Sequence, residues 1–475
     1  MDYNKLSVKE IAEKIASRDL KSYDVVRYFV QKCEENMALN AVVEIFYDSL
    51  DRAKEIDAQL DSGKKLGALA GVPIAIKDNI LYTGHKASCG SAFLVDFVAP
   101  YSATIVEKLL NAGAVIIGRT NMDEFAMGGS TENSIHGVCH NAVNNNHVAG
   151  GSSGGSAVAV AAGLVPCAIG TDTGGSIRQP ASFNGVVGIK PTYGTVSRYG
   201  IVAYASSLDQ ASPIAKSVSD CRYVLEILAG KDVNDGTTIV NPLDSIKKDT
   251  IKLGVCKQIM DAYKAMPQYS DFMAGVERLK ERCEIVEVDM PHITNTLACY
   301  YIIAPAEATS NLARFDGIKY TARSEKARDL ESVYIESRTE GFGKEVKRRI
   351  MLGNYVLSSG YFDAYYNKAK SVQKLIRKEF DTVFNTCDAL VLPTTPGEAF
   401  AIGEKIGDPI AMYMEDLFTV PANIAGVPAI SIPYGVGAKG LPLGMQFMAM
   451  RGNDGMLCDI AAECAKFVKG EAYVK

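Results

Sequence analysis

The sequence is poor in the residues and segments on which several common functions depend. Its 475 residues include no tryptophan and only five histidines. It has no run of about 18 apolar residues that could form a membrane-spanning helix. The net charge is −5, so the chain has no excess of positive charge with which to bind nucleic acid by itself. A Walker-type phosphate loop is also missing. These absences argue against a membrane protein, a nucleic-acid-binding protein and a P-loop enzyme.

Metal-ligand patterns are also scarce. The chain has eleven cysteines, an odd number, with no C-x-x-C spacing, and several lie in apolar segments such as the one around Cys167. His136 and His140 stand four residues apart, but the glycine and asparagines around them indicate a loop with two solvated histidines. We therefore expect no metal site, reduced and buried thiols, and a cytoplasmic protein without membrane contact.

Hydrophobic patterning predicts an α/β protein with a central mixed β-sheet covered by helices on both faces. Residues 1–60 are predicted to form helices, beginning with a capping box at Ser7-Val8-Lys9-Glu10. A polar, helix-rich stretch over about 230–385 suggests a cap-like region, and without a linker or repeat we expect one domain over 1–475. The short apolar segments predicted as strands are Val72–Ile76, Ala114–Gly118, Cys167–Thr171, Val186–Ile189, Lys252–Cys256, Glu284–Val288, Ala389–Leu392, Ala429–Pro433 and Leu443–Met448.

Two serines in glycine-rich segments and one lysine at a strand end are the candidates for catalysis. Ser152 lies in Gly150-Gly151-Ser152-Ser153-Gly154-Gly155-Ser156, and Ser176 ends Asp172-Thr173-Gly174-Gly175-Ser176. Glycines let a reacting carbonyl approach the backbone, whose successive N–H groups can stabilise an oxyanion. Lys77 follows an apolar segment, and a buried lysine loses its proton easily and can act as a base. The pattern predicts a serine nucleophile activated by lysine, in an enzyme that cleaves amides.

Other interpretations of these segments stay open at this point. Gly151-Ser152-Ser153-Gly154-Gly155 also fits the G-x-S-x-G nucleophile motif with Ser153 as nucleophile, but the only later histidine is His292, in an unrelated context. The same glycine-rich segment precedes a helix and can bind phosphate there, although no lysine follows at the phosphate-loop position. Lys77 taken alone can be a surface lysine that ends a strand.

The three segments closely resemble the pattern of the amidase signature family. That pattern is a lysine in Pro-x-x-x-Lys-Asp, then Gly-Gly-Ser-Ser-Gly-Gly-Ser and Asp-Thr-Gly-Gly-Ser, matched here at 73–78, 150–156 and 172–176. The resemblance implies the amidase-signature fold and a Ser-cisSer-Lys triad. Ser176 would be the nucleophile, Ser152 the serine after a cis peptide bond, and Lys77 the base. The backbone of residues 173–176 would form the oxyanion site.

Longer matches resemble members that hydrolyse glutamine for a tRNA-dependent amidotransferase. For glutamine, the resemblance implies that Arg349 binds the carboxylate and Asp416 the amine, with Tyr301, Gly128 and Ser130 as further contacts. Without the resemblance, Arg349 is one of several solvated charges on a basic helix. The matching segments are Asn121–Gly128, Ser130–Ser134, Lys190–Gly194, Val196–Gly200, Ser206–Gln210, Gly341–Arg349 and Asn423–Pro428.

The resemblance also implies partners, because ammonia released into bulk water would be lost. A tRNA-binding, ATP-using amidotransferase subunit would receive the ammonia and hold Glu-tRNA(Gln), ATP and Mg²⁺, with or without a small third subunit. This chain itself would need no cofactor. Two other functions stay open. One is a stand-alone amidase that hydrolyses small amides with the same triad, and the other is an inactive scaffold, which the intact triad disfavours.

Overall fold

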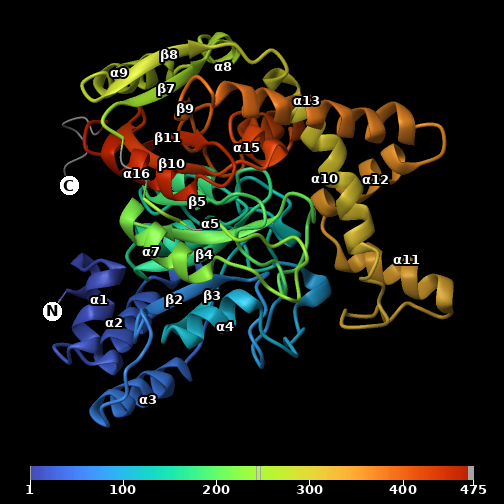
Figure 1. The fold of residues 1–475 in the computed structure, drawn as a ribbon. Coiled ribbons are helices and arrows are strands. Elements are labelled where there is room, and N and C mark those ends of the chain that lie inside the picture. The colour runs from blue at the N-terminus through green and yellow to red at the C-terminus, as the bar shows by residue number, and fades with distance from the viewer. Residues whose placement is uncertain (1, 242, 246–247, 469–475) are drawn as a thin grey trace.

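A single 11-stranded sheet runs through the molecule, with helices around it (Figure 1). The computed structural model describes residues 2–241, 243–245 and 248–468. The strands are β1 Val42–Ile45, β2 Pro73–Lys77, β3 Val115–Thr120, β4 Cys167–Asp172, β5 Val187–Lys190, β6 Gln210–Ala215, β7 Ile251–Cys256, β8 Cys283–Val288, β9 Ala389–Pro393, β10 Ala429–Val436 and β11 Pro442–Ala449. The helices are α1 Val8–Ala16, α2 Ser22–Glu35, α3 Ser49–Asp61, α4 Thr104–Asn111, α5 Gly154–Ala161, α6 Arg178–Asn184, α7 Val218–Leu228, α8 Lys257–Tyr263, α9 Tyr269–Leu279, α10 Thr296–Leu312, α11 Leu330–Gly341, α12 Lys344–Leu357, α13 Lys368–Val383, α14 Pro409–Tyr413, α15 Val420–Ala425 and α16 Asp454–Cys464.

The sheet is mixed, as predicted. Its order is β1-β3-β2-β4-β6-β5-β10-β11-β9-β7-β8. β2 pairs in parallel with β3 and β4, and β7 pairs in parallel with β8 and β9, while the remaining pairs are antiparallel. All nine predicted strands are present, but β1 and β6 were missed. β1 lies inside the stretch 1–60 that was predicted to form helices, although its Val42, Val43 and Ile45 are β-branched residues typical of strands. β6 buries polar residues such as Gln210 and Ser212, so it lacks the apolar pattern of a strand.

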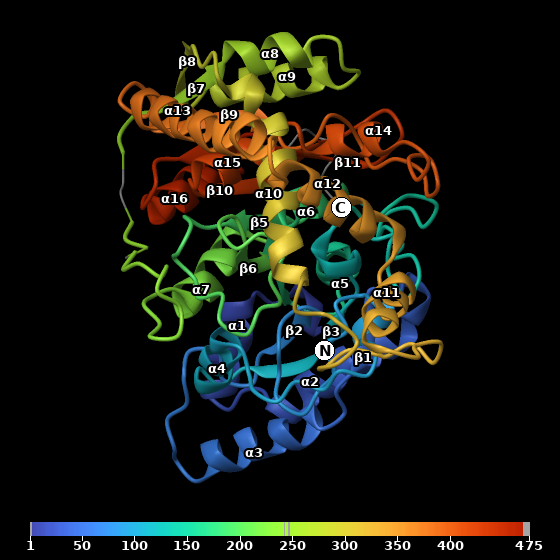
Figure 2. The same cartoon turned by 90° about the vertical axis from the view of Figure 1, so that its right-hand side faces the viewer.

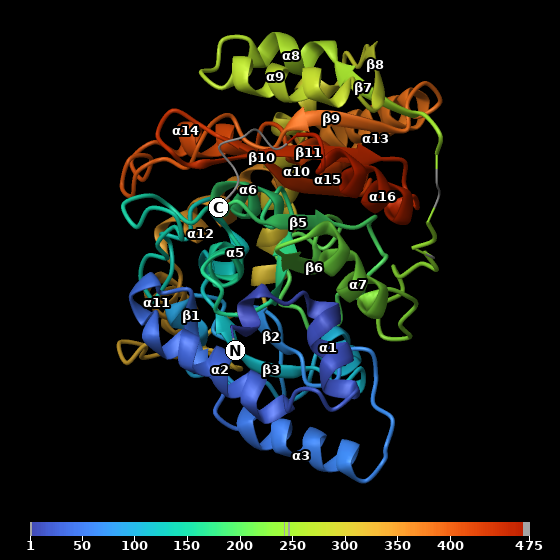
Figure 3. The same ribbon diagram turned by 90° about the vertical axis from the view of Figure 1, so that its left-hand side faces the viewer.

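Helices cover both faces of this sheet. α7 packs on β5 and β6, and α16 packs on β10 and β11, whereas α5 and α6 cover the other side (Figure 2 and Figure 3). The predicted N-terminal helices are confirmed as α1, α2 and α3. The capping box is present because Ser7 Oγ accepts the Glu10 N–H at 3.1 Å and Glu10 Oε2 accepts the Ser7 N–H at 2.8 Å. No helix in the described ranges is both long enough and apolar enough to span a bilayer.

The stretch over 230–385 contributes both to the sheet and to its cover. β7 and β8 from this stretch form one end of the sheet, while α10, α11 and α12 stand along one side of the molecule (Figure 1, right). A π-helical segment, Phe362–Asn367, leads directly into α13. The organisation of the whole chain as one domain with a cap stays a prediction.

The central strands bring the candidate catalytic segments to one edge of the sheet. β2 and β4 are neighbours and parallel, with Ile76 paired to Ile169, so their carboxyl ends lie side by side. Every residue of both strands is buried. Lys77 ends β2 and Asp172 ends β4, and the segment that leads to Ser176 follows β4 directly. The other glycine-rich segment lies between β3 and β4 in the chain and reaches this edge through the contact of Ser152 with Lys77. Ligands of α/β proteins typically bind at such strand ends.

Candidate active site

Lys77 is fully buried, and hydroxyl groups surround its amine. Its Nζ lies 2.8 Å from Ser152 Oγ, 2.9 Å from Ser153 Oγ and 2.9 Å from Thr171 Oγ1. Thr171 lies on β4, and the parallel pairing of β2 with β4 brings it to Lys77. The alternative interpretation of Lys77 as a surface lysine is therefore wrong.

Burial lowers the pKa of Lys77 from 10.5 to about 7, because the ammonium form loses its hydration. The negative charges of Asp123, Asp172 and Asp209 oppose this shift. Near neutral pH a large share of the amine is therefore unprotonated, and its lone pair can accept a proton. Ser153 already donates its proton to the Thr171 carbonyl oxygen at 2.9 Å. Ser152 is therefore better placed than Ser153 to donate its proton to Lys77.

The backbone holds Ser152 and Ser176 in adjacent segments. The Gly151–Ser152 peptide bond is cis, and the Ser153 N–H donates to the Ser176 carbonyl oxygen at 3.1 Å. Ser152 is fully buried, whereas Ser176 is 8% exposed and can be reached by a substrate. The Ser176 hydroxyl makes no hydrogen bond to any described residue. The structure thus joins Lys77 to Ser152 directly, and it leaves the hydroxyl of Ser176 in the adjacent segment free of hydrogen bonds to described residues.

A buried ion pair anchors the loop that ends in Ser176. Asp172 accepts hydrogen bonds from Arg178 Nε and Nη2, both at 3.1 Å, and from Asn423 Nδ2 at 2.8 Å. Burial alone would raise the pKa of Asp172, but Arg178 and Asn423 overcome that effect and lower it to about 2. The loop is therefore anchored by a carboxylate that is ionised at neutral pH.

Three of the four predicted oxyanion N–H groups are available. The N–H of Gly175 donates to Asp172 Oδ1 at 2.9 Å, so this N–H is already engaged and Gly175 is not a candidate for the oxyanion site. The N–H groups of Thr173, Gly174 and Ser176 have no acceptor within the described part of the chain. They can therefore donate to a developing negative charge near the Ser176 hydroxyl.

Arg349 lies on α12 inside a cage of aromatic rings. Its guanidinium carbon is 5.6 Å from the ring centroids of Tyr204 and Tyr301 and 5.4 Å from that of Tyr413. Its Nε donates to Glu345 Oε1 at 2.8 Å and its Nη1 to Tyr204 Oη at 2.7 Å. Nη2 has no hydrogen-bond partner among the residues described, so it is available to a ligand carboxylate. Arg349 is buried and is not a solvated charge on a basic helix.

Asp416 and Tyr301 belong to the same cluster. Tyr301 Oη donates to Asp416 Oδ2 at 2.6 Å, and the Tyr301 ring stacks on Tyr413 with centroids 4.1 Å apart. Burial raises the pKa of Asp416 to about 7, although the Tyr301 hydrogen bond and the charge of Arg349 work against the rise. A bound ammonium group would favour the carboxylate form. The structure thus gathers three predicted substrate residues from α12, α10 and the turn after α14.

This aromatic cluster packs against the oxyanion loop. Tyr204 and Thr173 share one carboxylate, because Asp209 accepts the Tyr204 N–H at 3.0 Å and the Thr173 hydroxyl at 2.6 Å. Tyr300 lies so close to Gly174 that a β-carbon there would be 2.6 Å from the phenol oxygen. Candidate substrate-binding and catalytic residues therefore form one continuous site.

The loop with Gly128 and Ser130 lies against the segment before Ser152. Gln179 bridges the two, because its Nε2 donates to the Gly129 carbonyl oxygen and its Oε1 accepts the Gly151 N–H, both at 2.8 Å. Ser130 is fully buried, and its hydroxyl has no partner among the described residues. These two predicted substrate contacts thus lie beside the cis peptide bond.

Several supporting residues were missed by sequence reasoning. Asp172 and Arg178 have opposite charges and flank Ser176, so their ion pair could have been suspected from the sequence. No such feature of the sequence marked Thr171, Gln179 or Tyr204. Their roles depend on which distant segments meet them, and residue type does not show that.

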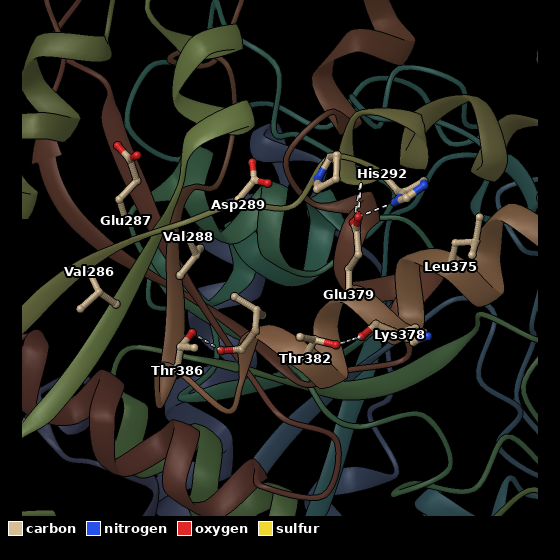
Figure 4. Close-up of a pocket in the computed structure, with 12 residues that line it drawn as sticks. Val286, Glu287, Val288, Asp289, His292, Leu375, Lys378, Glu379, Thr382 and Thr386 are labelled. Carbon is tan, nitrogen blue, oxygen red and sulfur yellow. Dashed lines mark hydrogen bonds and ion pairs between the residues drawn. The ribbon is translucent and has the colours of Figure 1, made fainter.

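A separate cavity of about 570 Å³ lies between β8 and α13 and contains none of these residues (Figure 4). Its lining includes His292, whose Nδ1 lies 2.5 Å from Glu379 Oε1. His292 is therefore paired elsewhere and is not a base for Ser153, so the G-x-S-x-G interpretation finds no support. His136 and His140 lie outside helices, as expected for a loop. His136 is not solvated as predicted, because its side chain is only 19% exposed and its Nε2 lies 2.9 Å from Ser88 Oγ.

Comparison with known proteins identifies the family. The amidase family model matches residues 24–458. The chain belongs to the amidase family. This amidase is 47% identical over 470 residues to the A subunit of glutamyl-tRNA(Gln) amidotransferase from Koribacter versatilis, a match that covers 97% of this chain and 98% of the relative. The corresponding protein of the same name from a Synechococcus strain is 47% identical over 94% of this chain and 93% of its own.

Solved structures confirm the predicted amidase-signature fold. The A subunit of glutamyl-tRNA(Gln) amidotransferase from Thermotoga maritima is 38% identical, with a TM-score of 0.77 over 96% of this chain and 94% of its own. A peptide amidase from Stenotrophomonas maltophilia is 29% identical, with a TM-score of 0.82 over 98% and 97% of the two chains. The family, the fold and the enzymatic class expected from the sequence are thus confirmed.

Proposed function

We propose that this amidase is the glutamine-hydrolysing subunit of a tRNA-dependent amidotransferase. The observation that carries the proposal is the contact of buried Lys77 with Ser152, in a site that also contains Arg349 and Asp416. Glutamine has one carboxylate and one ammonium group besides its amide, and this arginine and this aspartate are their natural partners. The names of the relatives with 47% and 38% identity support the same activity.

In the proposed reaction, neutral Lys77 accepts the proton of Ser152. Ser152 in turn accepts the proton of Ser176 as Ser176 Oγ attacks the side-chain amide carbon of glutamine. The N–H groups of Thr173, Gly174 and Ser176 hold the tetrahedral oxyanion. The proton then returns through Ser152 to the leaving nitrogen, and the C–N bond breaks. Water hydrolyses the remaining glutamyl ester to glutamate, which regenerates the Ser176 hydroxyl.

The proposal includes a partner to which the ammonia passes. A second subunit would bind Glu-tRNA(Gln), ATP and Mg²⁺ and amidate the activated glutamate, with or without a small third subunit, in the cytoplasm. The net charge of −5 on this chain suits that division of labour, because tRNA binding would fall to the partner. This chain would need no cofactor of its own.

A stand-alone amidase is the second candidate, and one observation favours it. The solved structures of an amidase and of a peptide amidase have TM-scores of 0.83 and 0.82, above the 0.77 of the Thermotoga maritima protein. Their identity is lower, at 28% and 29% against 38%, so we prefer the amidotransferase.

The two candidates are distinguished by purification of the native complex through a tag on this chain. The assay is ammonia release from glutamine, with Ser176→Ala as the blank. Release that disappears in the variant, from a sample with a stoichiometric second protein that supports ATP-dependent amidation of Glu-tRNA(Gln), would support the amidotransferase. A lone chain that hydrolyses simple amides and ignores glutamine would support the stand-alone amidase.

A further inference from the structure

Asp123 is a fully buried carboxylate that no step of the proposed reaction uses. Its Oδ2 accepts the N–H groups of Thr131 at 2.9 Å and Ser130 at 3.3 Å, and its Oδ1 accepts the Asn133 N–H at 3.3 Å. Its own N–H donates to the Ser152 carbonyl oxygen at 3.3 Å. One residue therefore binds both the loop with Ser130 and the segment with the cis serine.

Two glycines leave room for this carboxylate. A β-carbon at Gly128 would lie 2.3 Å from Asp123 Cγ, and a β-carbon at Gly151 would lie 2.0 Å from Asp123 Oδ2. A side chain at either glycine would displace the carboxylate. Asp123 thus fills the space between the loop with Ser130 and the peptide bond before Ser152. Its position determines the spacing between these two segments.

Asp123 holds the backbone of Ser130, a residue whose hydroxyl has no partner among the described residues. Ser130 Oγ is buried and makes no hydrogen bond to a described residue. Buried polar groups in folded proteins nearly always have a partner, and Ser130 is also the serine that the family resemblance implies as a substrate contact. Because Asp123 holds the Ser130 N–H, it also determines where the hydroxyl stands relative to Ser152.

Asp123 also acts on the proposed base. It is the largest of the carboxylate influences that favour the ammonium form of Lys77. Burial raises the pKa of Asp123 to about 6, so this carboxyl is largely ionised at pH 7 to 8. The other ionisable groups that act on or near it are Lys77 from β2, Glu132 from its own loop and the buried thiol of Cys139.

We infer that Asp123 is a positioning residue for amide hydrolysis, which holds the Ser130 hydroxyl beside the cis serine and counterbalances the charge of Lys77. The inference deepens the proposed function and rests on it. Asp123 touches neither the substrate nor the reacting atoms in the proposed reaction. It acts through Ser130 and through Lys77.

The test is Asp123→Asn, which keeps the size of the side chain but removes its charge and one acceptor oxygen. We expect kcat/KM for amide hydrolysis to fall about tenfold to a hundredfold, the usual effect of losing hydrogen bonds to a charged group. KM should rise, because Ser130 is no longer held. The acid limb of the kcat/KM profile should move to lower pH, because the ammonium form of Lys77 loses a stabilising charge.

A matched control is Asp220→Asn. Asp220 is also a buried carboxylate that accepts a backbone N–H and a serine hydroxyl, from Val8 and Ser217, both at 2.9 Å, but it lies on α7. We expect its kinetics and acid limb to match the wild type. The acid limb is also read from the rate at which a fluorophosphonate labels Ser176, a measurement that needs no glutamine.

The inference is overturned if Asp123→Asn has an unchanged kcat/KM. It is also overturned if the acid limb of Asp123→Asn lies at the same pH as that of Asp220→Asn. If circular dichroism shows that Asp123→Asn is unfolded, Ser130→Ala replaces it, and a raised KM is expected with the acid limb unmoved. Wild-type KM and kcat in Ser130→Ala would then overturn the inference.

The proposed function is judged separately on the wild type. If the wild type hydrolyses a small amide but not glutamine, the proposed function fails and the Asp123 test proceeds on that amide.

Discussion

Lys77→Met removes the amine that contacts Ser152 and leaves an unbranched side chain in the same buried space. Among the described residues no other base is hydrogen-bonded to Ser152 Oγ, so nothing would replace the amine. We expect kcat for amide hydrolysis to fall by about a hundredfold to ten-thousandfold, the usual contribution of a general base. The variant should still fold, because methionine fills the volume without a buried charge.

The pKa of Lys77 sets the size of the effect in the wild type. With a pKa of about 7 in place of 10.5, roughly half of the amine is neutral at pH 7, against roughly one part in 3,000 for an ordinary lysine. Burial thus makes the base about a thousandfold more available. The kcat/KM of the wild type should therefore rise with pH through an acid limb near 7 and level off above it.

Lys190 supplies a matched control on β5. It is also buried, and burial with the nearby charge of Arg178 lowers its pKa to about 7, but its Nζ donates to the Pro191 carbonyl oxygen at 2.7 Å and not to a serine. Lys190→Met should keep an acid limb near that of the wild type and most of its activity. The difference between the two methionine variants isolates the base from the general effect of removing a buried lysine.

Both variants should also change how stability depends on pH. The pKa of each lysine is lower in the folded than in the unfolded chain, so the unfolded chain binds more protons between about pH 7 and 10.5. The free energy of unfolding therefore rises with pH in this window, by about 1.4 kcal/mol per pH unit for each lysine. Each substitution should remove one such increment, as measured by urea titration at several pH values.

The assay is ammonia release, together with fluorophosphonate labelling of Ser176, measured across the neutral and alkaline range. A wild-type acid limb near the pKa of an ordinary lysine would refute the argument from burial. A Lys77→Met variant as active as Lys190→Met would refute the assignment of Lys77 as the base.

Three further predictions follow from single contacts. Arg349→Lys keeps the charge but loses the planar guanidinium, so KM for glutamine should rise about tenfold or more. Hydrolysis of an uncharged small amide should change little. An equal loss of activity on both substrates would argue against carboxylate binding by Arg349. Gly175→Ala requires alanine at φ +132° with its β-carbon 2.2 Å from Thr419 Oγ1, and should cost about 1–3 kcal/mol of unfolding free energy and slow catalysis. Thermal unfolding checks this, and an unchanged Tm would contradict the close contact. Asp172→Asn leaves the Arg178 guanidinium buried without its counter-charge and should cost about 3–5 kcal/mol, measured by urea unfolding; a cost near zero would mean that the ion pair does not anchor the loop.

Much of the fold was predictable, and so was the choice of candidate catalytic residues, because the relevant signals are local. Short apolar segments bounded by turn residues marked nine of the eleven strands. β6 escaped because it buries several polar side chains, and β1 escaped because its short β-branched segment lies between the N-terminal helices. The glycine-rich serine segments stood out by composition alone. The substrate-binding roles proposed for Arg349 and Asp416 came only through the family resemblance, because the sequence does not show whether a charged side chain is exposed to solvent or enclosed by aromatic rings.

The sequence by itself determined the chemical groups available and the segments that carry them: lysines at strand ends, serines among glycines, and no suitably placed histidine. The tertiary structure alone decided which of these groups meet. Lys77 reaches Thr171 because β2 and β4 pair in parallel across 94 residues of chain, and Arg349 reaches Tyr204 across 145. The lowered pKa of Lys77 and the commitment of the Gly175 N–H to Asp172 are likewise consequences of packing. Desolvation and hydrogen bonding depend on which atoms surround a group, and those neighbours come from distant parts of the chain.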